Sequence, residues 1–310
     1  MAEPIVYLNH EIVPATQAHV KIHDAGVVWG ATVTEMVRTF HHRLFRLDEH
    51  LARLARSLRY VRLDIGRTME EFTAALDELV QHNARLLSAN DELGLVIFIT
   101  AGEIAAYVGT ASMTARATPT VCAHTFPLSF ASWAEKMQNG AHVVTPSIRH
   151  VPPQCVDPKM KYRSRMHYYL AGKEAELVDP HAIPLLLDLQ GNATETSGAN
   201  FVIVEHGTIV SPTTRNILPG ISRQVVIELA EKLDIPFVER DFQVFNIVNA
   251  DEACMTSTPY CMLPVTRVNG LPIGSGVPGP VFRRLMNAWN EEVGLDVVQQ
   301  IVDMAKLRCQ

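Results

Sequence analysis

The stretch Gly191-Asn-Ala-Thr-Glu195-Thr-Ser-Gly-Ala-Asn200 leads directly into the apolar run Phe201–Val204, and this junction decides the local fold. The turn residues His206-Gly207 separate that run from a second one, Thr208–Val210. Two short apolar runs on either side of a glycine turn predict a β-hairpin. Glu195 is then either a solvated loop carboxylate or a carboxylate that a strand end directs into a cleft.

Downstream of the hairpin, Leu218-Pro-Gly-Ile-Ser222 opens an amphipathic stretch that predicts a helix through Leu233. The backbone N–H groups of Gly220, Ile221 and Ser222 would face outward at the positive end of the helix dipole. That arrangement suits a phosphate, although many helices begin with a similar sequence.

Three hydroxyls occur together in Thr256-Ser-Thr258-Pro259, after the predicted strand Ala253–Thr256. Hydroxyl groups at a strand end can donate hydrogen bonds to a phosphate or can form a turn. Both interpretations remain open from the residues alone.

Upstream of the hairpin, Asp157-Pro-Lys-Met-Lys161-Tyr-Arg-Ser164 precedes a predicted helix from about Ser164 to Leu177. A lysine in such a place can be a solvated surface residue. Alternatively, a partly buried amine beside cations such as Arg163 and Arg165 has a lowered pKa and can form imines. The spacing does not decide between the two.

The N-terminal part alternates strand and helix signals. A helix that Asp48 caps carries Leu51, Leu54 and Leu58 on one face, and Arg53 falls off that face. Arg53 is therefore either a solvent-exposed arginine or a bidentate phosphate ligand. The other predicted elements are a hairpin of Ile5–Leu8 with Ile12-Val13, a hairpin strand at Leu44–Leu47, a helix with a capping box from Thr68 to about Asn83, the strand Leu95–Thr100, the strand Ala141–Thr145, the strand Leu185–Asp188 and a helix over Val281–Val293.

This mixed order of elements predicts an α+β fold of two domains. We expect a small N-terminal α/β domain over residues 1–126, a linker over residues 127–136, and a larger C-terminal domain over residues 137–310.

Composition limits the function classes. The 310 residues carry a net charge of −6, which argues against nucleic-acid binding. Five cysteines without Cys-x-x-Cys spacing predict neither a disulfide framework nor a metal site, and they fit the cytoplasm. The N-terminus does not read as a signal peptide, and no stretch approaches the ~20 apolar residues of a membrane span.

Taken in order, these blocks resemble the class IV (fold type IV) aminotransferases, from about Tyr7 to Ile273. That family includes branched-chain, D-amino acid and (R)-amine transaminases as well as aminodeoxychorismate lyases. The block Trp29-Gly-Ala-Thr-Val-Thr-Glu35-Met-Val-Arg38 is similar to the family's aromatic-Gly…Val-aromatic-Glu strand, with Thr34 in place of the second aromatic. The resemblance implies a C-terminal pseudo-barrel domain and a homodimer with its active site at the subunit interface.

The resemblance also implies pyridoxal 5'-phosphate as cofactor. Counting back from Leu170-Ala-Gly-Lys-Glu-Ala175, the family's Schiff-base lysine falls on Lys161, which would also act as general base and acid, and not on Lys159. Glu195 would keep the pyridine nitrogen protonated. Arg165 would either bond the cofactor's O3' or face solvent. The implied phosphate and ring contacts are Arg53, Leu218, Gly220, Ile221, Ser222 and Thr258.

Substrate contacts depart from the family pattern. The apolar Leu93-Gly-Leu-Val96 and the segment Thr100-Ala101-Gly102 lack the arginines with which branched-chain and D-amino acid enzymes bind the substrate carboxylate. Ile148-Arg-His-Val-Pro-Pro153 looks more like the (R)-amine transaminases. Arg38 is a possible replacement ligand, and an arginine of a partner subunit is another. The candidate substrate-binding residues are Trp29, Thr34, Arg38 and Pro259.

The predicted function is transfer of an amino group between a small hydrophobic amine or amino acid and a 2-oxo acid by a ping-pong mechanism. Two alternatives remain: a lyase that eliminates pyruvate, and a cofactor-binding protein without activity.

Overall fold

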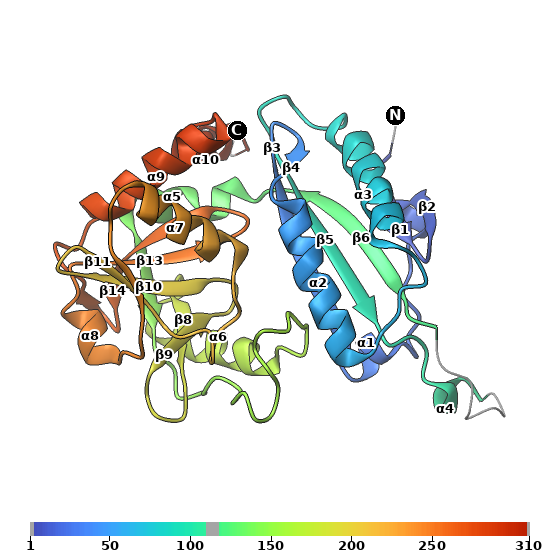
Figure 1. Cartoon of the computed structure of the whole chain (residues 1–310), viewed down its shortest axis with the longest axis horizontal. Helices are drawn as coiled ribbons and strands as arrows, with labels where there is room; N and C mark the ends of the chain where they lie inside the picture. Colours follow the sequence, from blue (N-terminus) through green and yellow to red (C-terminus); the bar gives the residue numbers. More distant parts are fainter. Residues whose placement is uncertain (1–2, 110–117, 309–310) are drawn as a thin grey trace. The chain divides into compact units, whose positions relative to one another are not determined.

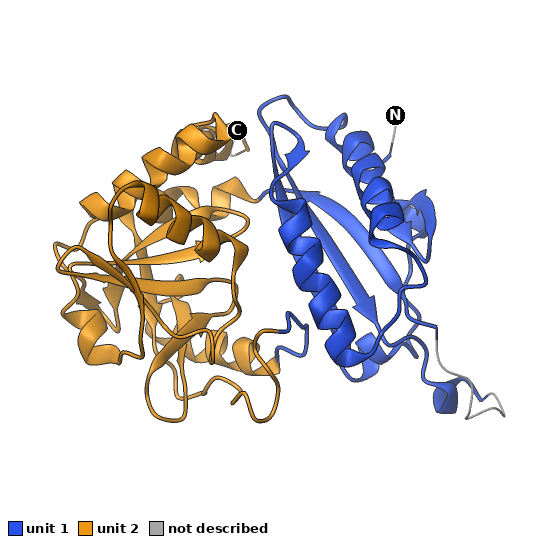
Figure 2. Cartoon of the chain, viewed as in Figure 1, with its two compact units in different colours: residues 1–128, 160–165 blue, residues 129–159, 166–310 orange. Residues whose placement is uncertain are grey.

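The computed structural model describes residues 3–109 and 118–308, which form two compact units (Figure 2). Unit 1 consists of Met1–Leu128 and Met160–Arg165, and unit 2 of Ser129–Lys159 and Met166–Gln310. Most of the predicted linker therefore belongs to unit 2. The segment with Lys161, which lies within the predicted C-terminal domain, belongs to unit 1 because its backbone pairs with a strand of that unit.

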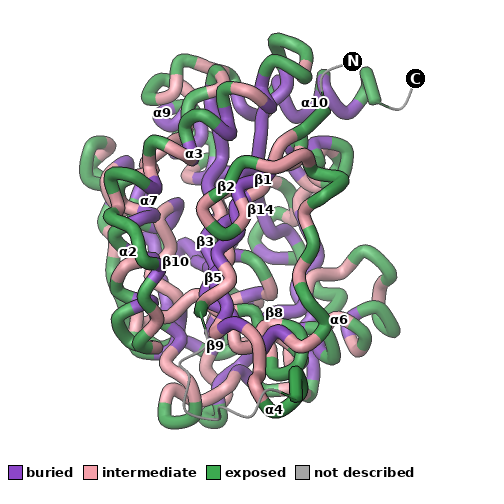
Figure 3. Tube along the Cα trace, turned by 90° about the vertical axis from the view of Figure 1, so that its right-hand side faces the viewer, coloured by how far each residue is buried: buried purple, intermediate pink, exposed green. Residues whose placement is uncertain are grey.

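Unit 1 is built on a sheet that, in the described residues, has six antiparallel strands in the order β2-β1-β6-β5-β3-β4. The predicted N-terminal hairpin is confirmed, with Val6 opposite Val13. The long central strands β3 and β5 are buried along most of their length (Figure 3). The strands are β1 (Ile5–Leu8), β2 (Glu11–Pro14), β3 (Thr32–Phe40), β4 (Arg43–Leu44), β5 (Leu93–Thr100) and β6 (Val121–Pro127).

Helices α2 (Leu47–Val61) and α3 (Met69–Ala84) cover one face of this sheet (Figure 1). Leucines and other apolar side chains of both helices pack on β3, β5 and β6, as the helical spacing predicts. The capping box that begins at Thr68 is confirmed. The shorter helical segments of unit 1 are η1 (Ala15–Gln17), α1 (Ala25–Val28) and α4 (Ala105–Val108).

The predicted start of α2 is wrong by two residues. Its N-cap is Arg46, in a left-handed conformation with φ 56°, and not Asp48. Strand β4 ends at Leu44, so the chain turns into the helix earlier than the strand Leu44–Leu47 would allow. Asp48 lies in the first helical turn, where its charge still stabilises the helix dipole.

Unit 2 contains a mixed sheet of nine strands within the described range. Because β9 pairs with both β8 and β10, six of the strands, β10-β13-β14-β7-β8-β9, close into a ring. The predicted hairpin is confirmed as β10 and β11. The strands are β7 (Ala141–Val144), β8 (Ile183–Leu187), β9 (Ala193–Thr196), β10 (Asn200–Glu205), β11 (Thr208–Ser211), β12 (Phe237–Glu239), β13 (Glu252–Ser257), β14 (Cys261–Val268) and β15 (Leu271–Pro272).

Helices pack around this ring, and the two-domain α+β fold is confirmed. Among the described helices, none combines the length and the apolar character that a bilayer crossing needs. The helical segments of unit 2 are η2 (Phe130–Ser132), α5 (Ala134–Asn139), α6 (Met166–Val178), α7 (Ile221–Lys232), α8 (Val244–Val248), α9 (Pro280–Val293) and α10 (Val297–Arg308).

Candidate active site

Lys161 lies on a short extended segment that pairs with the edge of β3. The backbone N–H of Thr34 donates to the carbonyl of Lys161 at 2.9 Å, and the N–H of Arg163 donates to Thr32 at 3.1 Å. These bonds flank an antiparallel bridge between Val33 and Tyr162. In this register Lys161 stands opposite Thr34, so two of the predicted site residues are neighbours across the pairing.

Gly30 permits the close approach of residues 161–164 to the start of β3. It has φ +66°, and its carbonyl accepts a hydrogen bond from Ser164 Oγ at 2.7 Å. A Cβ atom at Gly30 would lie 2.9 Å from Ser164 Oγ, which is too close for an ordinary contact. Trp29, a predicted substrate residue, precedes this glycine and is 63% exposed.

Arg53 is buried and paired, which excludes the solvent-exposed interpretation. Its Nε donates to Glu35 Oε1 at 2.7 Å and its Nη2 to Glu35 Oε2 at 2.8 Å. His50 Nδ1 lies 2.9 Å from Glu35 Oε2. Burial would raise the pKa of Glu35, but the charge of Arg53 and the hydrogen bonds from Arg53 and His50 outweigh it and lower that pKa to about 2.

Lys161 lies within electrostatic reach of this cluster. Burial lowers the pKa of His50, and the positive charges of Arg53 and Lys161 lower it further. The hydrogen bond from His50 to Glu35 and the negative charge of Glu35 act in the opposite direction, but the pKa of His50 stays below its ordinary value. The hydrogen-bonded cluster of Glu35, Arg53 and His50 therefore contains the predicted phosphate arginine, and Lys161 adds a positive charge that His50 senses.

Arg38 lies elsewhere on β3. It shares a face of the strand with Thr34, but four residues of extended chain separate the two by about 13 Å. Its Nε donates to the carbonyl of Thr39 at 3.1 Å, and its guanidinium lies 3.9 Å from the centre of the Phe40 ring. The side chain is 1% exposed.

In unit 2, Glu195 stands at the point where the ring of strands closes. Its strand position pairs with Asn200, and Asn200 Nδ2 donates to Oε2 of the carboxylate at 3.1 Å. The N–H of Leu218 donates to the same oxygen at 3.1 Å, and the hydroxyl of Tyr168 donates to Oε1 at 2.9 Å. Three donors therefore fix the direction of the Glu195 side chain, and the interpretation as a solvated loop residue is wrong.

Behind Glu195, Tyr168 connects to His150. The distance from His150 Nε2 to the Tyr168 hydroxyl is 3.1 Å, and to Glu195 Oε1 it is 3.6 Å. A tyrosine hydroxyl has one hydrogen, and here it points to Glu195, so the Tyr168 oxygen accepts from His150. The Nε2 atom of His150 therefore carries a hydrogen.

The start of α7 has the shape of a phosphate cradle. A Cβ atom at its N-cap, Gly220, would collide with Asn200 Oδ1, so only glycine permits this approach. Helix α7 also packs on β13, where the buried Thr256 Oγ1 has no hydrogen-bond partner among the described residues. An orphaned hydroxyl and open helix N–H groups near the predicted Ile221, Ser222 and Thr258 fit a phosphate group.

Several site residues were missed from sequence. His50 stands three residues before Arg53 on the same helix, a spacing that could have indicated it. Asn200 lies within the quoted Glu195 motif. His150 and Tyr168 had no local signal, because the fold alone brings them to Glu195. The role of Arg165, which is half-buried in unit 1, stays a prediction.

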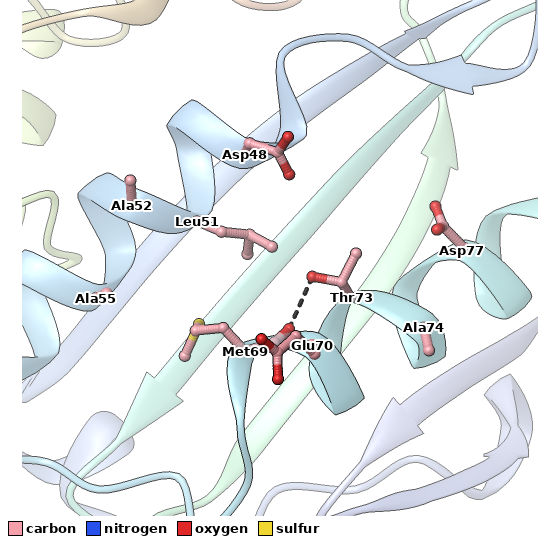
Figure 4. A pocket seen from close by; sticks show the side chains of 9 residues that line it. All are labelled: Asp48, Leu51, Ala52, Ala55, Met69, Glu70, Thr73, Ala74 and Asp77. Carbon is pink, nitrogen blue, oxygen red and sulfur yellow. Dashed lines mark hydrogen bonds between the residues drawn. The ribbon is translucent and has the colours of Figure 1, made fainter.

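A separate groove of about 540 Å³ lies between α2 and α3 (Figure 4). Leu51 and Met69 line this groove, and the hydroxyl of Thr73 donates to the carbonyl of Met69 at 2.7 Å. The predicted site residues are not among its lining side chains, so it is not the active site. Within the described residues, no group of three or more His, Cys, Asp or Glu side chains could hold a metal ion.

The chain is similar to known aminotransferases in both sequence and structure. The family model described as Amino-transferase class IV matches residues 32–268. The chain is 30% identical to the D-alanine aminotransferase of Staphylococcus haemolyticus over 93% of this chain and 97% of that protein. Its structure resembles the Escherichia coli branched-chain amino acid aminotransferase with a TM-score of 0.85, 25% identity and 94% coverage of both chains. The T.th. branched-chain amino acid aminotransferase with pyridoxamine 5'-phosphate gives a TM-score of 0.83, 26% identity and coverage of 94% of this chain and 95% of that one.

Proposed function

Because the chain belongs to the class IV aminotransferases, we propose that it transfers an amino group between a small hydrophobic amine or amino acid and a 2-oxo acid, using pyridoxal 5'-phosphate attached to Lys161. The bound cofactor supplies an electron sink for the substrate Cα, and the residues of this chain provide binding, orientation and proton transfer.

The observation that carries the proposal is the anchored carboxylate of Glu195. A carboxylate that accepts three hydrogen bonds has a fixed direction. Such a group stabilises a proton on the pyridine nitrogen, which the electron sink requires. A surface glutamate would need none of these contacts.

We assign the phosphate to Arg53, the N-terminus of α7 at Gly220–Ser222, and Thr258. Glu35 supports this assignment because its two hydrogen bonds fix the plane of the Arg53 guanidinium. Leu218 is assigned to the ring, because its N–H already belongs to the Glu195 network.

Lys161 is assigned as the acid and base that moves the proton at the substrate Cα. The fixed backbone pairing of Lys161 with Thr34 supports this role, since a proton carrier needs a defined position. Two half-reactions that share one lysine predict ping-pong kinetics.

The proposed preference for small hydrophobic donors rests on strand β5, whose apolar side chains replace the arginine of branched-chain enzymes. Trp29, Thr34 and Pro259 are assigned to the substrate on the basis of the family resemblance alone.

We further propose a homodimer located in the cytoplasm. Two segments of unit 1 carry exposed large apolar side chains, namely Ile22, Val27, Trp29, Tyr107 and Val108, and the N–H of Ile104 donates to the carbonyl of His23 to join these segments. Exposed apolar side chains on neighbouring segments support a protein interface at this place.

The test is a donor panel. Yellow holoenzyme is mixed with D- and L-amino acids and with (R)- and (S)-amines, and bleaching of the lysine-bound cofactor band identifies the donors. Addition of a 2-oxo acid should restore the band. Pyruvate release without an acceptor would support the lyase alternative, and a yellow protein that no donor bleaches would be a binding protein.

A further inference from the structure

We infer that Arg163 binds the substrate carboxylate and so supplies the charge that β5 lacks. This inference rests on the proposed role of Lys161 and names an amino acid or 2-oxo acid, with its α-carboxylate, as the substrate class of that site.

The direction of the side chains along the Lys161 segment supports this inference. The hydrogen bonds from Thr34 to Lys161 and from Arg163 to Thr32 show that residues 161–163 are extended and paired with β3. Side chains two residues apart in an extended segment leave on the same side. Lys161 and Arg163 therefore face the same way, and Tyr162 faces the opposite way with Val33.

The position of the Arg163 guanidinium supports this inference as well. Its Cζ lies 4.7 Å from the centre of the Phe98 ring on β5. Phe98 stands opposite Thr34, which in turn stands opposite Lys161. Arg163 therefore places its charge over β5, one strand away from the pairing that holds the lysine.

The guanidinium of Arg163 remains available to a carboxylate ligand. Stacking on a ring uses the face of the guanidinium and leaves its N–H edge for a carboxylate. Arg163 is exposed, and within residues 3–109 and 118–308 no carboxylate forms an ion pair with it. By contrast, Arg53 and Arg223 are each engaged by a glutamate.

Arg38, the replacement predicted from sequence, is less suitable. It lies about 13 Å along β3 from Thr34, the residue opposite Lys161. It is 1% exposed, and the Phe40 ring packs against its guanidinium. Arg163 is therefore better placed than Arg38 to bind a substrate held at Lys161.

The experiment measures equilibrium binding of 4-methylvaleric acid, a carboxylate that cannot react, to the holoenzyme by spectral titration. We expect Arg163→Gln to weaken its Kd about 30-fold, in line with loss of a charged two-bond contact, and to raise the KM for 2-oxo acids by a similar factor. The Kd of Arg163→Lys for 4-methylvaleric acid should lie between the values of wild type and Arg163→Gln, because lysine keeps the positive charge but cannot form two parallel hydrogen bonds. The affinity for pyridoxal phosphate should not change.

The matched control is Arg56→Gln, which removes an exposed arginine of α2 and should bind 4-methylvaleric acid like wild type. An Arg163→Gln variant with wild-type Kd and KM values would overturn the inference and leave the proposed function intact. A wild-type protein that neither attaches the cofactor nor transaminates would instead reject the proposed function.

Discussion

Arg53 donates two parallel hydrogen bonds to Glu35, at 2.7 and 2.8 Å, from a side chain that is 4% exposed to one that is fully buried. This pair joins β3 to α2 in the core of unit 1. A buried charge whose partner is removed cannot be solvated, so each side chain depends on the other.

Replacement of Arg53 by Ala should therefore affect both stability and cofactor binding. The variant leaves the Glu35 carboxylate buried without its partner, which should lower the unfolding free energy of the apoprotein by about 3–5 kcal/mol, measured by urea denaturation. The double variant Glu35→Gln/Arg53→Met should recover most of that stability but not the affinity for pyridoxal phosphate. Wild-type cofactor affinity in both variants would remove Arg53 from the phosphate site.

The same cluster predicts loss of stability in acid. The pKa of Glu35 is about 2 in the fold against 4.5 ordinarily, so its contribution is complete above pH 4.5 and disappears as the pH falls towards 2. His50 has a pKa below its ordinary 6.5, so the unfolded chain takes up a proton first and stability begins to fall below that pH. Urea midpoints between pH 7 and pH 3 measure this. Between pH 4.5 and pH 3 the urea midpoint of the Glu35→Gln/Arg53→Met variant should decline less than that of wild type. Equal declines in the two proteins would contradict the lowered pKa of Glu35.

The sequence predicted the hairpins, the Thr68 capping box and the helix after Leu218 because each depends on local residue chemistry. It did not predict that residues 160–165 join unit 1, because that pairing links positions more than a hundred residues apart. The burial of Arg53 was missed for a related reason. Helical spacing placed it off the leucine face, and only the Glu35 side chain across from it makes that position a core position.

Tyr168 should position Glu195 without touching substrate. Tyr168→Phe removes one of three donors to the carboxylate, so we expect the first half-reaction to slow about tenfold at unchanged cofactor affinity. Tyr169→Phe, an exposed neighbour, is the control. In a Glu195→Gln background the Tyr168 change should have little further effect, since the two act through one contact. Fully additive losses in the double variant would mean that Tyr168 acts elsewhere.

Gly220 should tolerate no side chain. The Cβ of Gly220→Ala would push Asn200 away from Glu195 and Leu218, with a loss of about 1–3 kcal/mol in unfolding free energy and a weaker Kd for pyridoxal phosphate. Gly198→Ala is the matched control, because a Cβ there meets nothing within 4 Å. Equal stability and affinity of the two variants would contradict the close approach.

The attachment of the cofactor to one lysine is the centre of this account, and borohydride reduction of the yellow holoenzyme followed by peptide mapping measures it directly. We expect a pyridoxyl adduct on Lys161, its loss in Lys161→Ala, and its retention in Lys159→Ala, where the exposed lysine faces Asp157. An adduct on Lys159, or none on either lysine, would contradict the assignment.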